Sequence, residues 1–200
     1  MQLWYAPTSP FARKVRIAAG ELGLAGRIEL VRVDPWTDVR LRALNPLAKV
    51  PTLVRDDGGV LYESAVICDY LDALAPRRLL HPADGEARWR ALLLQGLADG
   101  AATAAGRLYA DERRPAHERS EAMMARFREA IGTSLDALDA DRHLADGVGI
   151  GQVAVAAFVS YLDFRWPERD WREGRPRLAA WFDAFARRDS MTGTPYATAG

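Results

Sequence analysis

Cysteine and histidine are scarce in this chain, which limits the kinds of site it can build. Cys68 is the only cysteine among 200 residues, so no intramolecular disulfide can form and the cytoplasm is the expected location. The three histidines, His81, His117 and His143, lie far apart and show no recognisable metal-ligand spacing. We therefore expect no metal site.

Net charge and long apolar runs are also missing. The 27 Lys and Arg residues balance 27 Asp and Glu residues, which argues against nucleic acid or an anionic membrane as the main partner. The longest apolar run, Val153–Val159, is far shorter than the roughly 18 residues of a membrane span. Met1–Tyr5 has neither the basic nor the apolar region of a secretory signal. We expect no membrane association.

The first 76 residues carry short apolar strands that alternate with amphipathic helices. Leu3–Tyr5 is a short aromatic strand that runs into a proline-containing loop. Ser9 then fits the N-cap of a helix, and Pro10 fits its first position. Over this part the pattern predicts strands at 3–5, 28–33, 52–55 and 60–62, and helices at 10–23, 39–44 and 65–74.

Beyond residue 76 the strand signals stop. A linker follows, and apolar residues then recur only at helical spacing. The sequence thus predicts an α/β domain over residues 1–76 and an all-α helical bundle over residues 84–200. In the second domain we expect helices at 86–112, from Pro115, at 150–164 and from Pro176.

Two stretches of the first domain are suited to hold an extended small peptide. A cis Val50–Pro51 bond would leave the N–H and C=O of Val50 available to a ligand, and X-Pro is the linkage at which a cis bond costs little. Glu63–Ser64 stands before an apolar-periodic run and predicts a helix N-terminus. Unpaired N–H groups and the positive dipole end attract a carboxylate there.

The order of these motifs resembles the cytosolic glutathione transferase superfamily, in particular a serine-type bacterial member. The matching segments are Thr8–Phe11, Asn45–Leu53 and Glu63–Ser64, followed by the all-helical second half. The resemblance implies a thioredoxin-like N-terminal domain that binds glutathione as co-substrate, and a C-terminal helical domain that supplies the pocket for a small electrophile. It also implies a cytoplasmic homodimer.

Ser9 matches the family position that faces the glutathione sulfur, and we expect it to be the catalytic residue. A thiolate rather than a thiol attacks an electrophile, and a hydroxyl at a helix N-terminus donates a hydrogen bond to that anion. Lowering a thiol pKa by two units requires about 2.7 kcal/mol. Ser9 acting only as an N-cap remains an alternative, as do Tyr5 and Thr8 as partners of the sulfur. Tyr5 could instead be a packing aromatic.

The resemblance also assigns the remaining glutathione contacts, residue by residue. Each has a simpler reading, because a lone Lys in a loop is usually solvated and a Glu-Ser pair is usually a helix cap. Asp99 matches a position that reaches the γ-glutamyl group across a dimer interface in some members, although a solvated or capping Asp is the commoner case. The expected contacts are Lys49 with the glycine carboxylate, Val50 and Pro51 with the cysteinyl backbone, and Glu63 and Ser64 with the γ-glutamyl group.

The second substrate is less defined by the sequence. We expect its pocket to draw on aromatic and basic side chains of both domains, while Cys68 lies on an apolar-periodic helix and reads as a core residue. The same thiolate site would serve an isomerase, a peroxidase or a dehalogenase, and the fold also occurs in non-catalytic binding or regulatory proteins. The expected pocket residues are Phe11, Trp36, Arg107, Tyr109 and Trp166.

Overall fold

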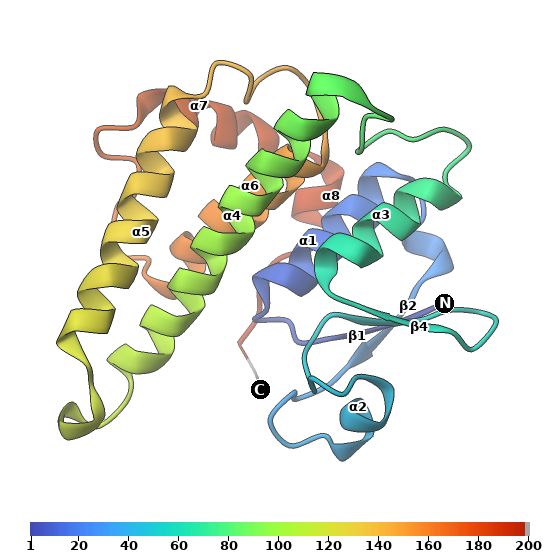
Figure 1. Cartoon of the computed structure of the whole chain (residues 1–200), viewed down its shortest axis with the longest axis horizontal. Helices are drawn as coiled ribbons and strands as arrows, with labels where there is room; N and C mark the ends of the chain where they lie inside the picture. Colours follow the sequence, from blue (N-terminus) through green and yellow to red (C-terminus); the bar gives the residue numbers. More distant parts are fainter. Residues whose placement is uncertain (199–200) are drawn as a thin grey trace.

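The computed structural model describes residues 1–198 and contains a small mixed sheet followed by a helical unit (Figure 1). Helices α1 and α3 cover one face of the sheet, and the short α2 lies on the other side. The predicted α/β unit followed by an all-α unit is therefore confirmed. The first unit consists of β1 (Gln2–Tyr5), α1 (Pro10–Glu21), β2 (Glu29–Arg32), α2 (Val39–Leu44), β3 (Thr52–Val54), β4 (Val60–Tyr62) and α3 (Ser64–Leu74).

The sheet has the strand order β2-β1-β3-β4. β1 pairs with β2 in parallel, whereas β3 is antiparallel to both β1 and β4. Trp4 of β1 lies opposite Thr52 of β3, and Thr52 lies opposite Tyr62 of β4. The register therefore brings the end of β1, the start of β3 and the end of β4 to one edge of the sheet.

Helix α1 begins as its sequence predicts. The Ser9 hydroxyl oxygen accepts a hydrogen bond from the Ala12 N–H at 3.2 Å, and Pro10 occupies the first helical position. Val15 and Ile17 lie on opposite sides of α1, and both are fully buried. Because α1 packs against α3 and also against α6, it belongs to the core of both units.

The helical unit is built around α6, whose residues from Val153 to Val159 are nearly all fully buried. Pro115 does not begin a helix of normal type as expected: a 3-10 turn follows it, and the next α-helix begins at Glu121, where the Ser120 hydroxyl caps the Met123 N–H. The helices of this unit are α4 (Gly85–Glu112), α5 (Glu121–Ala140), α6 (Ile150–Arg165), α7 (Pro176–Phe185) and α8 (Asp189–Thr192).

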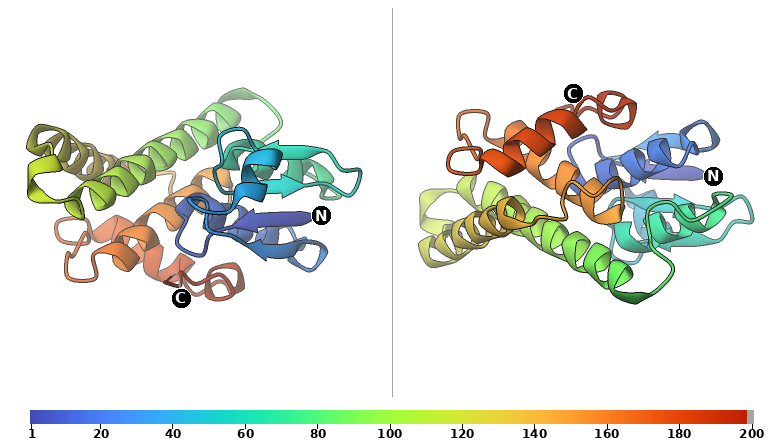
Figure 2. Two further views of the ribbon diagram at one scale, coloured as in Figure 1. Left: turned by 90° about the horizontal axis from the view of Figure 1, so that it is seen from below. Right: turned by 90° about the horizontal axis from the view of Figure 1, so that it is seen from above.

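Polar contacts join the two units along α1. The buried Lys14 ammonium lies 2.6 and 2.8 Å from the two Asp99 oxygens on α4. At the C-terminal end of α1, Glu21 accepts two hydrogen bonds from Arg188 and one from the Ser190 hydroxyl. Figure 2 shows the two units side by side, with the C-terminal segment returning to α1. Helix α1 is thus joined to the helical unit near its middle and at its C-terminal end.

The linker between the units is held by one buried carboxylate. Asp72 accepts hydrogen bonds from the backbone N–H groups of Leu79, Leu80 and His81 at 2.8 to 3.1 Å, and from the His81 ring at 3.0 Å. Burial alone would raise the pKa of Asp72, but these donors outweigh it and the pKa is lowered. The end of α3 therefore fixes the start of the second unit.

Candidate glutathione site

Three loops meet at the edge of the sheet described above. Pro7–Ser9 follows β1, Val50–Pro51 precedes β3, and Glu63 follows β4. Their positions follow from the strand register, because Trp4, Thr52 and Tyr62 are direct neighbours across the sheet. The segments that the sequence singled out over 60 residues therefore lie together in space.

Ser9 combines a used acceptor with an available donor. Its oxygen accepts from the Ala12 N–H at 3.2 Å, and its backbone N–H donates to the Ala6 carbonyl at 3.0 Å. A hydroxyl carries one O–H donor beside its acceptor lone pairs. No described residue accepts the hydroxyl proton of Ser9, so it is available for an anion at the positive end of α1.

The Val50–Pro51 peptide bond is cis, as predicted. Within residues 1–198, neither the N–H nor the C=O of Val50 has a hydrogen-bond partner. The half-buried Val50 thus offers both backbone groups to an extended ligand, in the way that two strands pair.

Asn45 holds this loop in shape, and the sequence reasoning gave it no role. It is 1% exposed, and its amide donates to the Lys49 carbonyl at 3.1 Å and to the Thr52 hydroxyl at 3.0 Å. The side-chain oxygen of Asn45 accepts a hydrogen bond from the Leu47 N–H at 2.9 Å. An Asn directly before a Pro is a turn signal that could have indicated this contact. The Lys49 side chain itself is exposed.

Glu63 has an unusual backbone. Its φ of 67° lies in the left-handed region that non-glycine residues rarely adopt, and it stands at the N-cap of α3 without a capping hydrogen bond from its side chain. The exposed Glu63 carboxylate is therefore not used within the helix, while Ser64 beside it is buried. Strained backbone of this kind is typical of ligand-binding positions.

The two rivals of Ser9 have contacts of their own. Tyr5 is half-buried, and the Arg16 guanidinium lies 5.1 Å from its ring centre. The Thr8 carbonyl accepts a hydrogen bond of 3.5 Å from Arg165, at the end of α6. The loop before Ser9 is thus in direct contact with the helical unit.

A cluster of arginine and aromatic side chains lies beside that contact. The guanidinium carbons of Arg113 and Arg165 lie 3.2 and 4.0 Å from the ring centre of Tyr109, which also packs edge-on against Trp166. Sequence reasoning included Tyr109 and missed both arginines, because helices α4 and α6 meet only in the folded chain. Phe11 is half-buried and packs against the core.

Three other expected pocket residues differ widely in exposure. Trp36 is 93% exposed and Arg107 is exposed too, whereas Trp166 is 5% exposed and donates its indole N–H to Glu112 at 2.8 Å. The expectation of a solvated or capping Asp99 is wrong, because this carboxylate is paired with Lys14. Burial raises the pKa of Asp99 although Lys14 opposes it, and the nearby charge of Glu63 adds to the rise.

Cys68 is not a nucleophile in this arrangement. It is fully buried in α3, and burial raises the pKa of its thiol to about 12. A buried neutral thiol is unreactive, so the interpretation of Cys68 as a core residue is confirmed.

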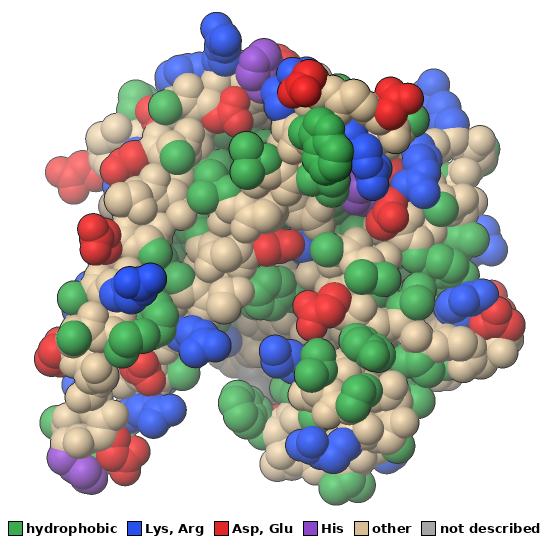
Figure 3. All heavy atoms as spheres, viewed as in Figure 1, with side chains coloured by type: hydrophobic (Ala, Val, Ile, Leu, Met, Phe, Trp, Pro, Cys, Tyr) green, Lys and Arg blue, Asp and Glu red, His purple; other side chains and the backbone are tan. Residues whose placement is uncertain are grey.

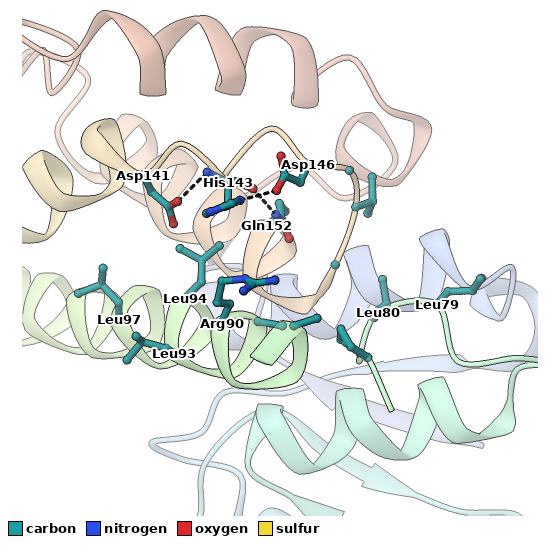
Figure 4. A pocket seen from close by; sticks show the side chains of 16 residues that line it. Leu79, Leu80, Arg90, Leu93, Leu94, Leu97, Asp141, His143, Asp146 and Gln152 are labelled. Atoms are coloured by element: carbon teal, nitrogen blue, oxygen red, sulfur yellow. Dashed lines mark hydrogen bonds and ion pairs between the residues drawn. The ribbon is translucent and has the colours of Figure 1, made fainter. Parts of the chain in front are cut away.

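An apolar cavity of about 380 Å³ lies away from these loops, at the start of α4 (Figure 4). Leu80 and Leu94 line it, and His143 lies at its rim between Asp141 and Asp146. None of the predicted glutathione contacts lines this cavity. Around the loops themselves, Figure 3 shows an open hollow between the two units, with Lys and Arg side chains at its rim.

The described part of the chain has neither a cluster of metal ligands nor a membrane-spanning helix. Among residues 1–198, no group of three or more His, Cys, Asp or Glu side chains is arranged to hold a metal ion. In the same range, no helix is both long and apolar enough for a transmembrane span.

A four-stranded mixed sheet with a cis-proline loop, joined to a helical unit, defines a thioredoxin-like domain followed by a helical C-terminal domain. Comparison with known proteins gives the family. The family description "Glutathione S-transferase, N-terminal domain" matches residues 8–74, and "Glutathione S-transferase, C-terminal domain" matches residues 115–184. The chain belongs to the glutathione S-transferase family.

Relatives over the full length agree with this assignment. The chain is similar to the uncharacterised GST-like protein YibF of Escherichia coli, with 32% identity over 97% of this chain and 98% of the other. It also resembles a glutathione transferase family member from Pseudomonas fluorescens Pf-5 with bound glutathione (37% identity, TM-score 0.94, 98% and 99% of the two chains). A further Pf-5 structure holds S-(propanoic acid)-glutathione (37% identity, TM-score 0.90, 99% and 100% coverage).

Proposed function

We propose that this protein is a serine-type glutathione transferase, in which Ser9 stabilises the glutathione thiolate for attack on a small electrophile. The observation that carries the proposal is the state of the Ser9 hydroxyl. Its oxygen already accepts the Ala12 N–H, and its proton has no acceptor among residues 1–198. A sulfur anion at the N-terminus of α1 would receive that proton as a hydrogen bond and would also gain from the helix dipole.

The free-energy requirement is modest. Free thiols have a pKa of about 8.5, and holding a bound thiol mainly as thiolate at neutral pH requires a shift of about two units, or about 2.7 kcal/mol. A charge-assisted hydrogen bond contributes roughly 1.5 to 3 kcal/mol, and a helix N-terminus adds roughly 0.3 to 1 kcal/mol. The two contributions together match the need. Positioning of the second substrate would supply the remaining acceleration.

The surrounding loops support glutathione as the thiol substrate. The unpaired backbone groups of Val50 suit the cysteinyl residue, and the exposed Lys49 suits the glycine carboxylate. Glu63 and Ser64, at the N-terminus of α3, suit the γ-glutamyl ammonium and carboxylate. Asp99 lies close enough to Glu63 for the two charges to interact, which strengthens attraction for an ammonium.

The conjugate held by the similar Pseudomonas fluorescens protein supports sulfur alkylation rather than disulfide exchange. S-(propanoic acid)-glutathione is a thioether. This chain has no cysteine at the Ser9 position and its single thiol is buried, so a mixed disulfide between the protein and glutathione has no place to form. The cytoplasm, where glutathione is kept reduced, is the proposed location.

We also propose that the protein is a homodimer that buries the exposed apolar face of α3 and α4. Trp89 and Leu93 on α4 are 63% and 75% exposed, and Val66 on α3 is 50% exposed. In Figure 3 hydrophobic side chains lie over these two helices. Exposed patches of large apolar residues usually mark interfaces. Sedimentation of the wild type as a dimer and of Leu93→Glu as a folded monomer would support this, and a monomeric wild type at micromolar concentration would refute it.

Two measurements on one sample test the proposed activity. Calorimetric titration with glutathione gives the affinity, and ultraviolet difference absorbance against pH gives the pKa of the bound thiol. We expect binding with a thiol pKa clearly below that of free glutathione. Binding without such a shift would leave a carrier or regulatory protein, and no binding at millimolar glutathione would refute the proposal.

A further inference from the structure

Arg113 and Arg165 are two cations without a carboxylate partner within residues 1–198. Their neighbours differ in this respect. Arg114 pairs with Asp111, Arg169 pairs with Glu112, and Arg172 pairs with Asp163. Of the arginines around them, Arg119 also lacks a carboxylate partner within residues 1–198, but it donates to the Arg114 carbonyl and lies over no aromatic ring.

Both guanidinium groups lie over one aromatic ring. The Arg113 carbon is 3.2 Å and the Arg165 carbon 4.0 Å from the ring centre of Tyr109, so two positive charges are held close together. Stacking on an aromatic ring holds a guanidinium in place while leaving its edge N–H groups available. Two cations that share one ring repel each other, and a carboxylate bound to either guanidinium would reduce that repulsion.

The donors of the two arginines are mostly unused. Arg113 donates one hydrogen bond to the Tyr109 carbonyl at 3.1 Å, and Arg165 donates one to the Thr8 carbonyl at 3.5 Å. The Nε atom of Arg165 is buried and has no partner among the described residues. A guanidinium carries five N–H donors in a planar fork that matches a carboxylate. Each side chain thus uses one N–H donor in a contact at a helix end, and its other N–H donors have no partner among the described residues.

The carboxylates nearby do not supply the missing partner. Arg113 and Arg165 share the wall of an open cavity of about 590 Å³ with three glutamates and three further arginines. Glu112 is already bound to the Trp166 indole and to Arg169. Glu168 lies 3.6 Å from Arg169. The cavity therefore carries an excess of positive charge at the end formed by α4 and α6.

We propose that Arg113 and Arg165 bind a carboxylate of the electrophilic substrate, so that the enzyme prefers electrophiles bearing an acid group. This inference rests on the proposed function. Arg165 contacts the residue directly before Ser9, so a carboxylate held by it would lie a few bonds from the carbon that the sulfur attacks. In a substitution the C–S bond forms and the halide leaves with the electrons of its bond to carbon. The thiol proton has already gone to solvent.

A matched pair of chromogenic substrates tests the inference. The probes are 4-chloro-3,5-dinitrobenzoate and its neutral carboxamide, with each kcat/KM divided by the uncatalysed rate constant to remove their difference in reactivity. We expect the carboxylate to be favoured by about tenfold or more, the size of a charge-assisted hydrogen bond. Arg113→Gln should bring the ratio close to one. Arg114→Gln, an equal charge change at the next residue of the chain, should leave it unchanged.

Binding of the two glutathione conjugates made from these probes gives a second readout that does not need turnover. The carboxylate conjugate should bind about tenfold more tightly than the carboxamide to the wild type and to Arg114→Gln, but not to Arg113→Gln. Arg165→Lys, which keeps the charge and loses the planar fork, should lose most of the preference.

The outcomes separate the two proposals. Equal normalised kcat/KM for the two probes would overturn the carboxylate inference and leave the transferase proposal standing. No turnover of either probe would remove the transferase proposal, and equal affinity for the two conjugates would then overturn the inference as well. If Arg113→Gln weakens glutathione itself as much as the carboxylate conjugate, the arginine serves the tripeptide and the inference falls.

Discussion

Ser9 contributes to the molecule through two different atoms. Its oxygen caps α1 by accepting the Ala12 N–H, while its hydroxyl proton is directed to whatever occupies the site. A side chain with this double role stabilises both the helix and the bound anion, and substitutions can separate the two effects. The residues that compete with it, Tyr5 and Thr8, do not cap the helix.

Replacement of Ser9 by Ala should therefore lower both activity and stability. Loss of the cap costs about 1 kcal/mol of unfolding free energy. Loss of the hydrogen bond to sulfur should raise the thiol pKa by about one unit and lower kcat/KM about tenfold at neutral pH. Ser9→Thr keeps the hydroxyl and the cap and should restore most of both. Full activity in Ser9→Ala would assign the sulfur contact to Tyr5 or Thr8, which Tyr5→Phe and Thr8→Val would then distinguish.

Asn45 is the residue most directly responsible for the shape of the cis-proline loop. Three of its hydrogen bonds are satisfied inside the protein, and it is 1% exposed. Asn45→Ala should cost about 2 kcal/mol of unfolding free energy, because buried partners lose their donors and acceptor. It should also raise the Kd for glutathione with little change in the thiol pKa. Unchanged affinity would show that the loop keeps its shape without Asn45.

Ser9 and Asn45 differ in how far their roles can be predicted from the sequence. Ser9 could be predicted as a cap because Ser-Pro before an amphipathic run is a local signal. The role of Asn45 depends on where Lys49 and Thr52 come to lie, and that of Arg165 depends on the crossing of α4 and α6. Such contacts between distant segments are not encoded in periodicity or spacing.

At the scale of elements, the short helix α8 and the residue before it bind the C-terminal end of α1. It has only four residues, too few for a periodic signal, and it was not predicted. Arg188, directly before it, donates two hydrogen bonds of 2.7 Å to Glu21. The Ser190 hydroxyl adds a third hydrogen bond to the same carboxylate. The last turn of α1 is thereby tied to the C-terminal part of the chain.

This contact should make stability depend on pH in the acid range. The hydrogen bonds from Arg188 lower the pKa of Glu21. The contribution of Glu21 is therefore complete above the unfolded-state pKa of about 4.3 and is lost as the pH falls through the lower folded-state pKa. In urea unfolding, Glu21→Gln should be less stable than the wild type at pH 7, and the gap should narrow toward pH 3. The exposed Glu173→Gln serves as control and should show no gap at either pH.

Other element boundaries show why the prediction was incomplete. Helix α1 carries both an N-cap and an apolar stripe, so its start was predicted to the residue. The start of α5 was placed at Pro115 on the rule that Pro favours a first helical turn. The chain instead forms a 3-10 turn there and uses Ser120 as the cap. Two competing start signals lie five residues apart, and local preference alone does not decide between them.

At the scale of the whole molecule, α1 belongs to both units. Its N-terminal end holds Ser9, and its buried Lys14 pairs with Asp99 of α4. Lys14 is 1% exposed, and Asp99 is its one ion-pair partner among residues 1–198. Sequence reasoning offered Asp99 as a ligand contact or as a solvated or capping residue and missed the ion pair, because nothing in the sequence indicates that a Lys on an amphipathic helix is buried. Because the ion pair joins α1 to α4, it helps to fix how the two units are oriented around the site.

Loss of either member of the Lys14–Asp99 ion pair should destabilise the protein. Asp99→Asn leaves a buried ammonium without its counter-ion and should lower the unfolding free energy by about 3 kcal/mol, whereas Lys14→Met leaves a half-buried carboxylate and should cost somewhat less. The double variant Lys14→Met, Asp99→Leu removes both charges and should recover most of that loss, since replacing a buried pair with apolar side chains is often nearly neutral. Urea unfolding at pH 7 measures all three.

An exposed ion pair of the same kind provides the control. Arg78 and Asp69 are each 40% exposed or more, so Asp69→Asn should cost less than about 1 kcal/mol. Additive losses in the double variant would mean that Lys14 and Asp99 do not stabilise each other. If instead the losses are not additive, the double variant also distinguishes an effect on stability from an effect on glutathione binding. It should unfold like the wild type, yet bind glutathione less well if the charge of Asp99 beside Glu63 attracts the γ-glutamyl ammonium.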